Sequence, residues 1–311
     1  MKQTLTKGDV IIFKAENDWL SKAIAWFTQS DVCHAAMAYS EDSIVEVGAS
    51  GIGVHKVEIT DGDNVYVMRL VSEPNPEPLI ASADAYINAK VRYDFPKLFI
   101  LAGAIIYRRI IPTTDVLHVS NEILTVCTFM LDEMIQHALL HHTDQAMVCS
   151  ELVYRIFYDC GGEYEIQIVD GCLWNGHITE DIVDSIRLYD HLSAKNINTN
   201  SFTDDLTLPE KELTSSFPTP EKTEYLAEKL YTALCQSEIQ LQENQSIKNK
   251  AAALNLSPTL FKAEKFLSKL KYFLDLVKCD LPIEAMFITP GDLVYHAENL
   301  KKQGSLYLER I

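Results

Sequence analysis

Residues 148–160 read VCSELVYRIFYDC and place a cysteine at the start of a predicted helix. Leu152, Ile156 and Phe157 recur at helical spacing, and Gly161-Gly162 is expected to end the helix because glycine disfavours helical backbone. A helix with one apolar face must bury that face against another element. The preceding part of the chain must therefore provide the surface against which this helix packs, and that surface decides the fold.

That chain is β-rich over its first 70 residues. Short segments with β-branched or small apolar residues, separated by Gly, Asp and Ser, predict strands at Val10–Phe13, Val32–Tyr39, Ser43–Val47, Gly53–Ile59 and Val65–Leu70. An amphipathic helix is predicted over Asn17–Thr28. We therefore expect an α+β fold, in which a small antiparallel sheet or open barrel packs on helices.

The rest of the chain is predicted to be mainly helical. Helices are expected at Leu79–Val91, Phe95–Arg109, Glu122–Leu140, about Glu224–Cys235 and Pro258–Val277. Residues 196–223 are dense in Thr, Ser, Asn, Asp and Pro, which predicts a long polar loop. The pattern of Phe287–Val294 (FITPGDLV) predicts a strand followed by a turn.

Composition excludes some function classes. The 311 residues include 27 Lys and Arg against 44 Asp and Glu, which gives a net charge of −17. Phosphate backbones repel such a chain, so no nucleic-acid partner is expected. Seven irregularly spaced cysteines are typical of free thiols in a reducing compartment.

Neither a secretory signal nor a membrane span is expected from the sequence, which agrees with a reducing compartment. Met1–Phe13 lacks the long apolar run of a secretory signal, and the apolar run Leu98–Ile106 is too short to span a bilayer. We therefore expect a cytoplasmic protein with no transmembrane segment.

Several short motifs occur in a specific order. GDVIIF at Gly8–Phe13 and SDVCH at Ser30–His34 are followed by Glu46, and much later by VCSELV at Val148–Val153. In this order the chain resembles the permuted branch of the papain-like cysteine hydrolases, the YiiX-like group related to NlpC-type peptidases. ITPGDL at Ile288–Leu293 resembles the segment that ends such domains.

The resemblance covers about 1–160 and 286–296. It implies a hydrolase core formed by 1–162 and 286–311, with 163–285 as an insertion that holds the polar loop and two helices. Three roles are open for such a helical lobe. It would shape the substrate cleft, serve a purely structural purpose or bind a protein partner.

The resemblance also implies roles for particular residues. Cys149 would be the nucleophile, His34 the base and Glu46 the residue that orients the base. The backbone N–H of Cys149 would help to bind the oxyanion, and Tyr93 is a candidate second donor with a packing role equally open. No metal or cofactor is implied.

Elementary chemistry supports this assignment. A thiol attacks carbonyl carbon as a thiolate, and the positive end of a helix dipole at Cys149 favours the anion. A neighbouring imidazole would hold the thiolate as an ion pair, and a carboxylate would orient the imidazole.

This mechanism requires a particular strand register. A tight turn centred on Ser40 would place His34 directly opposite Glu46, with both side chains on one face. A two-residue turn at Glu41-Asp42 would place Glu46 opposite Met37, on the other face. Cys33 is expected to point away from His34 because side chains alternate along a strand, and it is therefore not expected to be the nucleophile.

Three functions remain open at this point. The first is a cysteine hydrolase of peptide or other amide bonds, with ester and thioester bonds also open. The second is an acyltransferase of the lecithin-retinol-acyltransferase type, in which the helix at Leu98–Ile106 would line a channel for an acyl chain. The third is a catalytically idle module that recruits a protein partner through 224–278.

Overall fold

The computed structural model describes residues 5–48, 50–94, 97, 100–101, 114–140, 146–176, 257–277 and 282–311. The predicted polar loop 196–223 and the predicted helix 224–235 lie outside these residues, as does most of the predicted helix 95–109. The fold is a mixed α+β structure in which an antiparallel sheet packs against helices.

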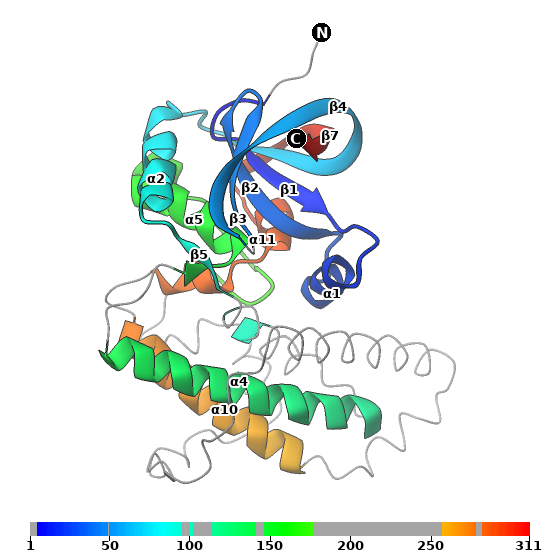
Figure 1. The fold of residues 1–311 in the computed structure, drawn as a ribbon, viewed down its shortest axis with the longest axis vertical. Helices are drawn as coiled ribbons and strands as arrows, with labels where there is room; N and C mark the ends of the chain where they lie inside the picture. The colour runs from blue at the N-terminus through cyan, green and yellow to red at the C-terminus, as the bar shows by residue number, and fades with distance from the viewer. Residues whose placement is uncertain are drawn as a thin grey trace.

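The sheet has five strands and closes on itself. Its order is β1-β2-β3-β4-β7, and β1 also pairs with β4, so the first four strands form a closed circuit of pairings (Figure 1). The strands are β1 (Val10–Lys14), β2 (Val32–Ser40), β3 (Ser43–Gly48), β4 (Gly51–Leu70) and β7 (Leu300–Arg310).

Strand β4 is long enough to pair with three other strands. Its first residues pair with β3, Val65–Met68 pair with β1, and most of its length pairs with β7. We predicted two strands here because Asp61-Gly62-Asp63 resembles a turn. The structure instead accommodates these residues where the β4–β7 register shifts between Thr60 and Val65.

The central strand β1 is buried on both faces. Ile11 and Phe13 pack in a cluster with barrel residues such as Val65. Val10 and Ile12 face the larger core that the helices share. Burial on both faces explains why VIIF is continuously apolar instead of alternating.

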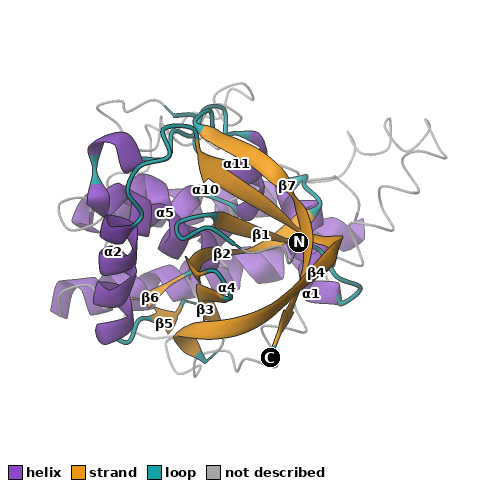
Figure 2. Ribbon diagram, turned by 90° about the horizontal axis from the view of Figure 1, so that it is seen from above, coloured by secondary structure: helices purple, strands orange, loops and turns teal. Residues whose placement is uncertain are grey.

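Helices cover one side of the barrel. Helices α2 (Glu77–Asn88) and α5 (Cys149–Cys160) pack together, and α5 also contacts β2 and β3. Figure 2 shows these two helices beside the strands. Helix α1 (Trp19–Thr28) contacts β2. A short parallel pair joins β5 (Arg92–Tyr93) to β6 (Ala146–Met147), and β6 directly precedes α5 in the chain.

A second layer contains α4 (Thr114–Leu140) and α10 (Ser257–Val277), which pack along each other (Figure 1). The helix predicted at Pro258–Val277 is confirmed, and four of its apolar residues are buried: Phe266, Leu270, Phe273 and Leu274. Lys269 of α10 forms an ion pair with Asp132 of α4. Among the described residues, no helix has the length and apolar content needed to cross a bilayer.

The strand predicted at Phe287–Val294 is wrong. A 3₁₀ helix, η3 (Ile283–Phe287), is followed by the short helix α11 (Pro290–Tyr295). Thr289 caps α11: its hydroxyl accepts from the N–H of Asp292 at 3.2 Å, and the Asp292 carboxylate accepts from the N–H of Thr289 at 2.8 Å. A threonine cap followed by proline at the first helical position is a helix start, and this signal outweighs the apolar residues before it.

Candidate active site

Helix α5 places Cys149 at its first residue. Val148 is in the extended N-cap position, and its N–H donates to the Glu151 carboxylate at 3.4 Å. Leu152, Ile156 and Phe157 are fully buried and fix the orientation of the helix. Cys149 is 6% exposed, so its thiol lies at the positive end of the helix and almost out of water.

The register that we predicted between His34 and Glu46 is wrong, but the two side chains still meet. The turn is the two-residue one, with Ser40 paired to Ser43, and Tyr39 is an extra residue that shifts the ladder so that Met37 pairs with Val45. Continued, this register places Glu46 opposite Ala36, which shares a face with His34. Because of this bulge, Glu46 lies on the same face as His34. A two-residue turn without the bulge would place it on the opposite face.

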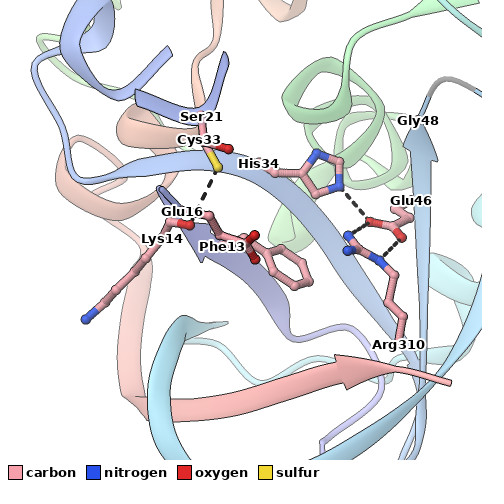
Figure 3. Close-up of a pocket in the computed structure, with 9 residues that line it drawn as sticks. All are labelled: Phe13, Lys14, Glu16, Ser21, Cys33, His34, Glu46, Gly48 and Arg310. Carbon is pink, nitrogen blue, oxygen red and sulfur yellow. Dashed lines mark hydrogen bonds and ion pairs between the residues drawn. The ribbon is translucent and has the colours of Figure 1, made fainter. Parts of the chain in front are cut away.

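His34, Glu46 and Arg310 form a continuous chain of hydrogen bonds. His34 Nε2 lies 2.6 Å from Glu46 Oε2. Arg310 donates to both carboxylate oxygens, from Nε to Oε1 at 2.6 Å and from Nη2 to Oε2 at 2.7 Å (Figure 3). Burial alone would raise the pKa of Glu46, but hydrogen bonds from His34 and Arg310 lower it to about 2. Glu46 is therefore a carboxylate throughout the neutral range.

Cys149 and His34 favour a thiolate–imidazolium pair. Burial raises the pKa of the Cys149 thiol, but the charge of His34 and a hydrogen bond from it outweigh burial and hold this pKa below its usual value. Backbone hydrogen bonds involving Ala35 and Ser150 act in the same direction. Burial lowers the pKa of His34, whereas Cys149 and Glu46 together raise it to about 10. Since Glu46 binds Nε2, Nδ1 is the ring nitrogen left for the thiol.

The prediction that Cys33 points away from His34 is not met. Phe13 pairs with His34 and Lys14 pairs with Val32, so Cys33 is an extra residue in β2 and side-chain alternation is interrupted there. Cys33 lines the same cavity as His34. Burial raises the pKa of the Cys33 thiol, which keeps it protonated and separates it chemically from Cys149.

Tyr93 lies close to the nucleophile. It pairs with Met147, two residues before Cys149. Burial raises the pKa of its hydroxyl, and the negative charge of Cys149 raises it further. The phenol is therefore protonated at neutral pH and chemically able to donate a hydrogen bond.

A cavity of about 320 Å³ opens beside His34 and Glu46. Figure 3 shows the nine side chains or backbone positions that line it: Phe13, Lys14, Glu16, Ser21, Cys33, His34, Glu46, Gly48 and Arg310. Most of these residues are polar or charged. In the described part of the chain, no three side chains of His, Cys, Asp or Glu are grouped to hold a metal ion.

Sequence reasoning missed a buried ion pair that supports the cysteine. Lys97 Nζ lies 3.0 and 3.1 Å from the two oxygens of Glu151, 3.4 Å from Asp94, and donates to the carbonyl of Ala146 at 2.7 Å. Lys97 and Glu151 are both almost completely buried. Together they join the segment after β5 to the start of α5. The only sequence signal was the glutamate two residues after Cys149.

The other motif residues hold the elements around the site together. The Asp9 carboxylate, which is buried, accepts from Arg69 Nε at 2.6 Å and Nη2 at 2.9 Å. Ser150 donates to the carbonyl of Ile288 at 2.6 Å, so the first turn of α5 is bonded to the segment that leads into α11. The side chains of Asp9 and Ser150 position strands and helices, while the backbone of Ser150 also bonds to the Cys149 thiol.

The buried Lys97–Glu151 pair gives a prediction about stability. Lys97→Met removes the closer cation from the buried carboxylates of Glu151 and Asp94 and leaves only Arg155, 3.7 Å from Glu151, which is expected to lower the free energy of unfolding by about 3 kcal/mol. The measurement is urea denaturation followed by circular dichroism. The double variant Lys97→Met/Glu151→Met removes both charges and should recover much of this loss.

A surface pair provides the control for this prediction. Lys7 Nζ lies 3.0 Å from Glu77, but both side chains are largely exposed. Lys7→Met is expected to change the free energy of unfolding by less than about 1 kcal/mol. Equal effects of Lys7→Met and Lys97→Met would contradict a supporting role for the buried pair.

Comparison with protein-family models, with curated proteins and with solved structures gave no match to this chain. The resemblance to the papain-like hydrolases therefore rests on the motifs quoted above.

Proposed function

We propose that this protein is a cysteine hydrolase that cleaves amide bonds through an acyl-enzyme, with the permuted papain-like arrangement that its motifs resemble. The observation that carries the proposal is geometric: a buried cysteine begins helix α5, and the neighbouring His34 is oriented by Glu46 at 2.6 Å. This is the arrangement that activates a thiol as a nucleophile.

In the first step, the Cys149 thiolate attacks the carbonyl carbon and a tetrahedral oxyanion forms. The N–H of Cys149 points from the first turn of α5 and serves as one oxyanion donor, and the Tyr93 hydroxyl is the candidate second donor. The His34 imidazolium then gives its proton to the leaving amine, so that an acyl-enzyme remains. Glu46 stabilises the imidazolium until that transfer.

In the second step, neutral His34 takes a proton from water, and the resulting hydroxide attacks the acyl-enzyme carbonyl. The carboxylic acid leaves, and the thiolate–imidazolium pair is restored. Every proton in this cycle passes through His34. No metal or cofactor enters it.

The mostly polar residues of the cavity beside His34 and Glu46 support a hydrolase of polar substrates, although Cys149 is not among the residues that line it. Phe13 is the one large apolar side chain among the residues that line it, beside charged groups such as Lys14, Glu16 and Arg310. Ester and thioester bonds remain open as alternative scissile bonds because the same thiolate attacks all three.

The test is the pH dependence of alkylation of Cys149 by iodoacetamide, followed by peptide mapping. An ordinary thiol near pKa 9 reacts faster as pH rises through 9. Because the pKa of Cys149 is lowered and that of His34 is about 10, the rate should reach its plateau at a lower pH than for an ordinary thiol and change again near pH 10, where the imidazolium is lost. A rate that simply rises through pH 9 would show a non-activated thiol and favour the idle binding module.

A further inference from the structure

The charges around Cys149 alternate in sign along a chain that ends at Arg310. The order is thiolate, imidazolium of His34, carboxylate of Glu46 and guanidinium of Arg310, which sums to zero. The Glu46 side chain is only 7% exposed. Without the guanidinium, the same buried cluster would carry a net negative charge, which favours protonation of its acidic members.

Arg310 is held in place on several sides. Its backbone pairs with Val57 of β4, and the N–H of the following residue, Ile311, donates to the carbonyl of Lys56 at 3.1 Å. Its guanidinium carbon lies 4.8 Å from the centre of the Phe13 ring, and that ring lies 5.5 Å from the ring of His34. Phe13 therefore contacts both ends of the His34–Glu46–Arg310 chain.

This geometry favours a fixed carboxylate. Glu46 Oε2 accepts from both His34 Nε2 and Arg310 Nη2, while Oε1 accepts from Arg310 Nε. Two parallel bonds from a planar guanidinium fix both the position and the plane of a carboxylate. The oxygen that orients His34 is thus itself oriented by a residue from the far end of the chain (Figure 3).

We propose that Arg310 is a positioning residue of the active site, which holds Glu46 ionised and aligned so that the Cys149–His34 ion pair persists in mild acid. The inference rests on the proposed function and adds to it a fourth member from β7. Arg310 acts through Glu46 and not on the substrate, so its effect must depend on the presence of the Glu46 charge.

The experiment measures the rate constant for iodoacetamide alkylation of Cys149 across pH in the full-length protein. Arg310→Met keeps much of the apolar stem and removes the charge, so the acid limb of the profile should move to higher pH. At about pH 5 we expect a rate loss of about tenfold, which corresponds to a shift of about one pKa unit. At about pH 9 the loss should shrink to less than about twofold, because most thiols are then ionised.

Two further variants test whether Arg310 acts on Cys149 reactivity through Glu46. Arg310→Lys keeps the charge but loses the paired donors, and it should fall between the wild type and Arg310→Met. In a Glu46→Gln background, adding Arg310→Met should change the rate by less than about twofold, because the group through which Arg310 acts is already neutral. An equal loss with and without the Glu46 charge would overturn the proposal.

The matched control is Arg69→Met. Arg69 of β4 makes the same kind of paired contact with buried Asp9, which directly precedes β1, and Arg69 and Arg310 lie at opposite ends of the β4–β7 ladder. Loss of a sheet-stabilising contact alone should therefore appear in both variants as lower stability, whereas the shifted acid limb should appear only in Arg310→Met. If Arg310→Met does not fold, Arg310→Lys takes its place, and an unchanged acid limb in that variant overturns the proposal.

A second readout separates this inference from the proposed function. The ring proton on His34 Nε2 is protected from exchange by Glu46, and its NMR resonance should broaden in Arg310→Met. If wild-type Cys149 alkylates like an ordinary thiol, the hydrolase proposal fails, and the broadening alone then decides whether Arg310 positions Glu46. If the resonance is unchanged and the acid limb does not move, Arg310 has no positioning role.

Discussion

Cys149→Ala is expected to abolish hydrolysis and alkylation at this position while the protein stays folded. The substitution removes the only atom that the proposed mechanism uses to form the acyl-enzyme. Loss of one buried sulfur atom should cost about 1 kcal/mol of stability. The measurements are turnover of a panel of fluorogenic amides and esters, together with circular dichroism and thermal unfolding.

Cys160→Ala is the matched control. Cys160 lies at the other end of α5, is partly buried, and its thiol donates to the carbonyl of Ile156 at 3.3 Å. It should retain full turnover and full alkylation at Cys149. Retained turnover in a folded Cys149→Ala variant would remove Cys149 from the mechanism.

His34→Ala is expected to lower turnover by about a thousandfold, because His34 both stabilises the thiolate and carries every proton. Glu46→Gln should be milder, at about 10- to 100-fold, since glutamine keeps one oxygen acceptor although it loses the charge and the second acceptor. The half-buried His55 of β4 offers a control, and His55→Ala should leave turnover unchanged. Equal losses at His34 and Glu46 would show that Glu46 does more than orient the ring.

Local sequence signals predicted most of the elements that carry the site. The strand at Val32, the strand at Ser43 and the helix at Cys149 begin where we predicted. In each case, a periodic run of apolar residues ends at residues that favour a turn, such as Gly161-Gly162 or Glu41-Asp42. Such signals depend only on neighbouring residues, so a single sequence contains them in full.

The parts that sequence reasoning missed depend on contacts between distant segments. The bulges at Cys33 and Tyr39 have no strong local mark, because each is fixed by how β2 pairs with its neighbours. Lys97 and Arg310 look like ordinary surface cations in the sequence. Only the folded structure brings Lys97 to Glu151 of α5 and Arg310 to Glu46.

The position of Arg310 in the chain has a consequence during synthesis. Arg310 lies 264 residues after Glu46, so its contact closes a very long loop and depends on β7 joining the barrel. A ribosome-bound chain that has already made β1 to β4 and α5 would carry Cys149 and His34 without their distal cation. By the argument above, the Cys149 thiol of the nascent protein would be less reactive in mild acid, and its full reactivity there would arise only when β7 emerges and pairs.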